Sequence, residues 1–215
     1  MYRIARAFLI ALMFVVPASA ARLVGKVAKG VYTSPKANFS VDVPSGMGMK
    51  VNDALNPVEP PIGVVSFHDD FGSMHRIFYM QLLMQGQTIK LPDDPKEIAG
   101  MLEEWIRKVI IPDWFAKASP DTRVLRIAPT KFEDQNAVVA LLDVPNGSAL
   151  VDMVTHKRLD SRQGAVAFFR NGYVYLITIE TLGVLEGPTA RAEPGENWAK
   201  VQDAIVPFYK TISFK

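Results

Sequence analysis

Two histidines and two aspartates within one short stretch are the side chains best suited to chemistry. They are His68, Asp69, Asp70 and His75. Two imidazoles and one carboxylate form a usable ligand set for zinc or iron. If the runs flanking Asp69 and Asp70 pair directly, His68 and His75 face each other with Cβ atoms about 5 Å apart, and Asp70 supplies a third ligand. One hypothesis is therefore a metal-dependent enzyme with its site at this hairpin.

Turn chemistry explains the same residues without a ligand. Aspartate favours the start of turns, Gly72 supplies a positive φ, and histidine tolerates a strand end. On this interpretation His68 and His75 do not share a site with Asp70, and the chain has no catalytic or cofactor-binding residue and no cofactor. The two interpretations differ in one geometric point, which is whether the three side chains converge.

The remaining chemical motifs are weaker. The stretch Gly46-Met47-Gly48-Met49 is too short to cradle a phosphate and is typical of a flexible turn, although two methionines can also ligate copper. A catalytic triad built on His156 would need a serine and an aspartate from distant positions.

A small basic cluster is a further candidate for binding. Lys157, Arg158 and Arg162 lie near an expected strand end. They indicate either a solvated turn or a contact with an anion or a partner.

The elements that must position these residues are mainly strands. Residues 64–68 and 75–83 predict a hairpin around the turn-rich stretch 69–73, and 39–43 alternates as a half-buried strand does. The second arm of the hairpin is apolar on both faces, so we expect both faces to be covered. In the second half the strand pattern recurs at 123–130, 137–144, 151–157, 165–170, 173–181 and 211–214. Asn171-Gly172 between 165–170 and 173–181 predicts a second hairpin.

Two helices are expected to cover the sheet. Asp94 and Pro95 begin an amphipathic pattern that places Trp105 on its apolar face and ends at Pro112. A second pattern near the end of the chain places Trp198 on its apolar face, and Pro207 should terminate or kink it. The sequence therefore predicts an α+β fold in which an antiparallel sheet is sandwiched between helices, an α/β/α sandwich.

The first twenty residues have the layout of a secretory signal peptide. Arg3 and Arg6 precede an apolar run, which ends before the small-residue triplet Ala18-Ser19-Ala20. The run is shorter than the roughly 20 apolar residues of a membrane-spanning helix. We therefore expect residues 1–20 to be removed, and residues 21–215 to form one globular domain with no membrane span.

Charge and cysteine content narrow the compartment and the partners. Removing the leader takes away two of the 24 Lys and Arg residues and leaves 22, which equals the 22 Asp and Glu residues. A neutral chain attracts phosphate backbones little, so nucleic acid is not expected as a partner. The chain has no cysteine, which favours a bacterial periplasmic or secreted protein, because a eukaryotic secreted protein of this size usually contains disulfides.

Short motifs at the two ends of the sequence carry a family resemblance. They are Tyr32-Thr33-Ser34-Pro35, Phe39-Ser40-Val41 and Pro44-Ser45-Gly46 near the start, and Phe208 with Ile212-Ser213-Phe214 after the last expected helix. This arrangement resembles the Mog1/PsbP-like superfamily, although Met47 stands where an aromatic residue often follows. The resemblance implies an α/β/α sandwich with an antiparallel sheet, and it favours binding or accessory roles over catalysis.

The sequence as a whole favours binding over catalysis. We expect an exported, non-catalytic envelope protein that acts as a binding or accessory module through loops at one end of its sheet. Its partner would be another envelope protein or a small ligand. The alternative is the metal-dependent enzyme centred on His68 and His75.

Overall fold

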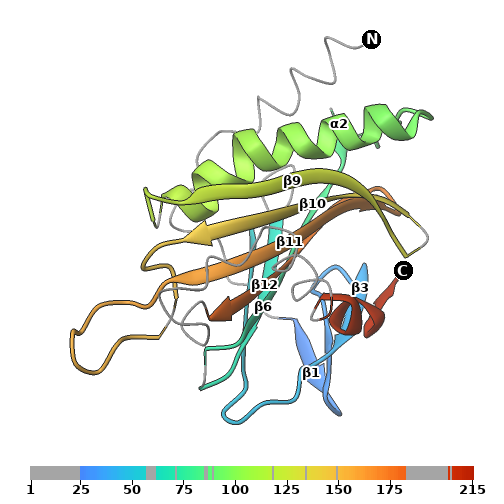
Figure 1. The fold of residues 1–215 in the computed structure, drawn as a ribbon. Helices are drawn as coiled ribbons and strands as arrows, with labels where there is room; N and C mark the ends of the chain where they lie inside the picture. Colours follow the sequence, from blue (N-terminus) through green and yellow to red (C-terminus); the bar gives the residue numbers. More distant parts are fainter. Residues whose placement is uncertain are drawn as a thin grey trace.

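The computed structural model describes residues 25–56, 62–70, 72–84, 87–88, 90–117, 119–133, 135–148, 150–182, 203 and 205–215. Within them the chain forms antiparallel sheets and a long helical segment that lies across one side of the larger sheet (Figure 1). The α+β class and the antiparallel pairing expected from the sequence are confirmed.

The larger sheet has seven strands and contains most of the core. Their spatial order is β4-β5-β6-β12-β11-β10-β9. The bounds along the chain are β4 (Lys50–Asn56), β5 (Ile62–His68), β6 (Met74–Gln81), β9 (Arg123–Phe132), β10 (Gln135–Val144), β11 (Ser161–Arg170) and β12 (Tyr173–Leu182). A short separate hairpin follows β6 and consists of β7 (Leu83–Met84) and β8 (Gln87–Thr88).

The smaller sheet joins the two ends of the described chain. It has four strands in the order β1-β2-β3-β13. Their bounds are β1 (Lys26–Ala28), β2 (Val31–Thr33), β3 (Phe39–Asp42) and β13 (Ile212–Phe214). The strands expected at 39–43 and 211–214 therefore pair with each other, and β13 lies at one edge of this sheet.

Two predicted hairpins are confirmed, and one predicted strand is wrong. β5 pairs with β6 around residues 69–73, and Asn171-Gly172 joins β11 to β12 with positive φ at both residues. The segment 151–157 is not a strand, because Asp152 accepts hydrogen bonds from the backbone N–H groups of Val154 and Thr155 and folds it into a turn. The segment forms an isolated β-bridge between Val151 and Arg158 and no longer ladder.

The first predicted helix is confirmed but does not end at Pro112. Helix α2 (Pro95–Trp105) begins at Asp94, whose carboxylate accepts a hydrogen bond of 2.9 Å from the Lys96 backbone N–H. It continues into the π-helix η1 (Ile106–Ala116), which passes through Pro112. Pro112 has no N–H to donate, but its carbonyl accepts a hydrogen bond of 3.1 Å from the Lys117 N–H, the spacing of a π turn.

Two hydrophobic cores lie on opposite faces of the seven-stranded sheet. One is formed with α2 and η1, and in it Trp105 is buried as predicted. The other lies between the two sheets and includes Phe39 and the helical residue Phe208. Strand β6 contributes to both cores, since Phe78 belongs to the first and Ile77 to the second.

The covering of the two faces departs from the expected α/β/α sandwich. Helices cover one face, whereas the other is covered by the four-stranded sheet together with the short helix at 205–210. That helix continues through Pro207 to Lys210, where we expected it to stop or kink. Trp198, predicted on the same helix, lies outside the described residues. None of the helices in the described part of the chain is long and apolar enough to cross a membrane.

Candidate functional site

The hairpin register separates the two histidines that the sequence placed together. His68 pairs with Met74, and His75 pairs with Phe67. Residues paired across an antiparallel ladder share a face and neighbours along a strand alternate, so His68 and His75 point to opposite faces of the sheet. The direct pairing that the metal-site hypothesis requires is therefore wrong by one residue.

Both aspartates of the hairpin turn have local partners. The Asp69 carboxylate accepts a hydrogen bond of 2.9 Å from the Ser73 backbone N–H, and Asp70 lies 3.1 Å from the Lys50 Nζ. Gly72 has a φ of 81°, as the turn interpretation expects. The described residues contain no group of three histidine or acidic side chains arranged to hold a metal ion.

His75 is partly buried and packs against the core residue Phe208. Its ring centroid lies 4.8 Å from that of Phe208, and its buried Nδ1 has no hydrogen-bond partner among the described atoms. Burial lowers the pKa of His75, and the nearby charge of Asp69 only partly opposes this shift. Burial therefore favours the neutral form of this side chain.

The other candidates from the sequence lie at the same end of the sheet as this turn. The backbone carbonyl of Met47 accepts a hydrogen bond from the Asp70 N–H, so the stretch 46–49 packs beside the turn. His156, Lys157 and Arg158 are exposed on the segment 145–160, which extends away from the sheet (Figure 1). Arg162, the third residue of the basic cluster, lies within β11.

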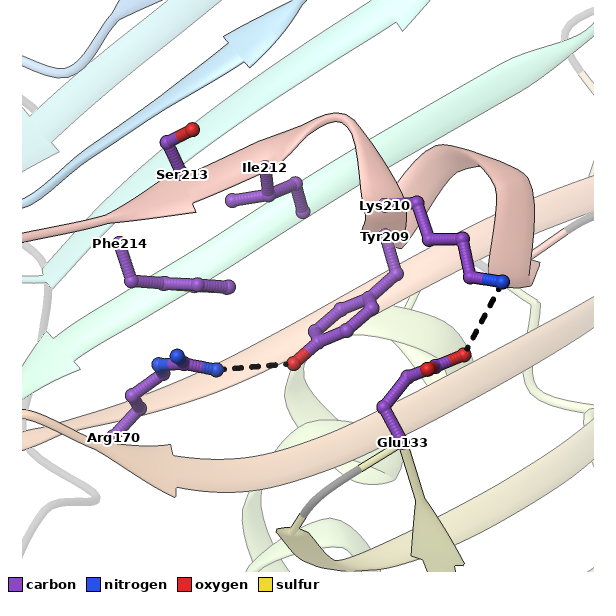
Figure 2. A pocket seen from close by; sticks show the side chains of 7 residues that line it. All are labelled: Glu133, Arg170, Tyr209, Lys210, Ile212, Ser213 and Phe214. Atoms are coloured by element: carbon purple, nitrogen blue, oxygen red, sulfur yellow. Dashed lines mark hydrogen bonds and ion pairs between the residues drawn. The ribbon is translucent and has the colours of Figure 1, made fainter.

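An open pocket of about 580 Å³ lies at the opposite end of the sheet. Figure 2 shows its lining side chains, which come from four separate parts of the chain. Glu133 follows β9, Arg170 ends β11, Tyr209 and Lys210 end the short helix, and β13 runs along one side with Ile212, Ser213 and Phe214. This pocket is the candidate functional site.

Arg170 is held in place by two aromatic side chains. Its guanidinium carbon lies 4.9 Å from the centre of the Phe214 ring, a cation–π geometry, and its Nη1 donates a hydrogen bond of 3.2 Å to the Tyr209 hydroxyl. The same hydroxyl accepts a hydrogen bond of 2.5 Å from the Gln135 amide. Together these contacts fix a positive charge at the wall of the pocket.

The second cation of the pocket is more weakly held. Lys210 Nζ lies 3.8 Å from Glu133 Oε1, and the two side chains are 63% and 38% exposed. An exposed ion pair at this distance contributes little stability, so a ligand carboxylate can compete with Glu133 for Lys210. The pocket thus combines one fixed and one adjustable positive charge with one negative charge.

Behind the pocket lies a closed aromatic layer. The ring of Phe214 lies 4.9 Å from that of Tyr175, and the Tyr175 hydroxyl accepts a hydrogen bond of 3.0 Å from the Asn38 amide. Burial raises the pKa of Tyr175 to about 12, although the Asn38 hydrogen bond lowers it. Tyr175 therefore stays protonated at neutral pH and belongs to the support of the site.

A second polar cluster lies on the helix-covered face of the sheet. The Arg76 guanidinium lies 4.0 Å from Glu180, whose side chain is only 1% exposed, and it also donates a hydrogen bond of 3.4 Å to Gln163. Burial lowers the pKa of Arg76, and Glu180 opposes that shift. Because the opposite charges of Arg76 and Glu180 compensate each other at the sheet, we assign this cluster a structural role.

Sequence reasoning missed every residue of the pocket. The sequence places Arg170 only at the end of the strand 165–170, and Phe214 only in the last expected strand and in a motif of the family resemblance. Glu133 and Lys210 are 77 positions apart by their numbering, and no motif in the sequence links them. The one available signal was the turn itself, which places Arg170 at the end of a strand.

Comparisons with known proteins found similar solved structures but no matching sequence. No protein-family model and no curated protein sequence matches the chain. Among solved structures, the chain is similar to the solution structure of cyanobacterial PsbP (CyanoP) from Synechocystis sp. PCC 6803, with a TM-score of 0.46 and 10% sequence identity. The match covers 93% of this chain and 100% of that one.

Proposed function

We propose that the protein is an exported, non-catalytic binding module of the bacterial envelope, and that it holds an anionic group of its ligand in the pocket beside β13. The ligand is a segment of another envelope protein or a small molecule. The observation that carries this proposal is the described pocket lining, which contains two cationic side chains, Arg170 and Lys210, and one acidic side chain, Glu133.

The arrangement of Arg170 supports binding of an anion. The side chain is already ordered by Phe214 and Tyr209, so little conformational entropy is lost when a ligand arrives. A guanidinium also matches the geometry of a carboxylate. A ligand with a carboxylate beside an apolar part would contact Arg170 and the Ile212 side of the pocket together.

A titration with a simple dicarboxylate tests the anion site. Glutarate added to the ¹⁵N-labelled protein should shift the backbone amide signals of Ile212, Ser213 and Phe214, whereas neutral glutaramide should not. Lys210→Glu should abolish the shifts because it reverses the adjustable charge. Lys96→Glu makes the same change on α2, across the seven-stranded sheet, and should leave the shifts intact. Absence of glutarate-induced shifts in the unmodified protein would contradict the proposed site.

Export is tested independently of the pocket. The arginines, apolar run and small-residue triplet of residues 1–20 support cleavage after Ala20. We expect the mature protein, recovered from the periplasm or the medium of a bacterial host, to begin at Ala21 by intact-mass measurement. Recovery of the full-length chain from the cytoplasm would contradict the assignment to the envelope.

A further inference from the structure

Strand β13 presents a free edge among the described strands. It stands last in the order β1-β2-β3-β13, and only β3 pairs with it. A strand edge carries backbone N–H and C=O groups that can pair with another extended chain. The direction in which each residue of β13 points these groups follows from its pairing with β3.

The hydrogen bonds at the two ends of β13 fix that direction. The Asp42 N–H donates to the Thr211 carbonyl at 3.4 Å, and the Lys215 N–H donates to the Asn38 carbonyl at 2.9 Å. Hydrogen-bonded and non-hydrogen-bonded pairs alternate along an antiparallel ladder, so Ser213 also bonds toward β3. Ile212 and Phe214 consequently direct their N–H and C=O groups away from β3, toward the free edge.

The pocket lies along this same strand. Ile212, Ser213 and Phe214 all line it. Arg170 lies across from Phe214, and Lys210 extends from the end of the preceding short helix toward Glu133 (Figure 2). An extended chain that paired with Ile212 and Phe214 would direct every second side chain into the pocket. Two cations and one acidic residue among the described lining residues favour an acidic side chain there.

We propose that β13 binds an extended segment of a partner protein by strand addition, with an acidic side chain of that segment facing Arg170 and Lys210. This inference rests on the proposed function, because it names the ligand of the same pocket. Backbone pairing with Ile212 and Phe214 supplies the affinity, and the two cations select the acidic residue. The partner needs no fixed sequence beyond an extended run with one carboxylate.

A short peptide provides the probe. It is an acetylated and amidated pentapeptide of threonine, valine, glutamate, valine and threonine. We expect it to bind at least tenfold more tightly than glutarate, and replacement of its glutamate by lysine should weaken binding at least tenfold. On the protein, Lys210→Glu should reverse this preference, whereas Lys96→Glu should preserve it.

Two N-methylated forms of the peptide distinguish strand pairing from simple charge attraction. One is methylated at both valine nitrogens, and the other at the glutamate nitrogen. Because alternate N–H groups of an added strand face opposite sides, one form should lose at least tenfold in affinity and the other should not. Equal binding of both forms, or equal loss, would overturn strand addition.

Hydrogen exchange gives a second readout on the protein itself. Bound peptide should slow exchange of the Ile212 and Phe214 amides at least tenfold, while the Ser213 amide, directed toward β3, should change little. If glutarate binds but the peptide binds no better, strand addition fails while the proposed anion site survives. If neither binds, both fail.

Sedimentation tests whether a second copy of the chain occupies the edge. We expect a monomer that binds the peptide. A dimer that excludes the peptide would instead assign the edge to a second copy of the chain.

Discussion

At one end of the seven-stranded sheet the chain reverses in tight turns after Phe132 and Arg170, whereas at the other end β10 and β11 are joined by the long segment 145–160 (Figure 1). The turn end holds the pocket with its fixed charges. The loop end exposes apolar side chains, with Met153 and Val154 each 87% accessible. Short connections let residues from distant parts of the chain converge, whereas the long connection mainly contacts neighbouring turns.

The loop end is nevertheless ordered at its base. Leu150 packs so closely on the hairpin turn at Gly72 that a Cβ added to this glycine would lie 2.6 Å from Leu150 Cγ. Asp152 stabilises the outer turn through two backbone N–H groups. The contrast between the two ends is therefore one of exposure at the tip and not of local order.

The largest effect is expected at Gly72. Gly72→Ala should lower the free energy of unfolding by about 2 to 5 kcal/mol, because left-handed backbone costs a residue with a Cβ about 1 to 2 kcal/mol and overpacking costs about 1 to 3 kcal/mol. Gly30→Ala is the control, since Gly30 has a similar φ of 76° but no atom within 4 Å of an added Cβ. Urea denaturation measures both variants. Equal losses would mean that Leu150 does not pack on the turn.

At the turn end the expected loss is smaller. Tyr209→Phe removes a hydroxyl that accepts hydrogen bonds from both Gln135 and Arg170, which should lower the free energy of unfolding by about 1 kcal/mol. It should also loosen Arg170 and so weaken glutarate binding. A variant that keeps full stability and full affinity would show that the Tyr209 hydroxyl does not order the pocket.

A pH dependence of stability is expected at the loop end. Burial holds the pKa of His75 below its ordinary value of 6.5, so the unfolded chain binds a proton at this residue more readily than the folded one. The contribution of neutral His75 is therefore complete above about pH 6.5 and is lost as the pH falls toward the folded pKa. Thermal unfolding from pH 7.5 to 5 should show a smaller decline for His75→Gln than for the unmodified protein. The same substitution at exposed His156 should keep the full decline.

The parts of the fold that the sequence predicted depend on local patterns. The Asn171-Gly172 turn and the Asp94 cap are set by adjacent residues, and so both were predicted correctly. The alternation of strands predicted the sheet but not the register, and a shift of one residue turned His75 away from the proposed site and onto the face that packs against Phe208. The covering of the second face depended on pairing between the chain ends, which no local pattern expresses.

The candidate site shows the same limit more strongly. His68, Asp70 and His75 are close together in the sequence and were therefore predicted as a site, and they lie at the loop end. The pocket at the turn end is built from Glu133, Arg170 and the end of the chain, which only the folded sheet brings together. Residue type and spacing therefore predicted turns well and a composite pocket not at all.

The smallest effect is expected at the tip of the 145–160 segment. Val154→Ser should change the free energy of unfolding by less than about 0.5 kcal/mol, because an exposed side chain loses no packing when it is shortened. Val139→Ser makes the same change at a residue that is 2% exposed in the core between the sheets, and should cost several times more, because it adds a buried hydroxyl and leaves a cavity. Urea denaturation of the two variants measures the difference. A loss above 1 kcal/mol at Val154 would mean that the tip packs against the protein, and the contrast between an exposed loop end and a closed turn end would then fail.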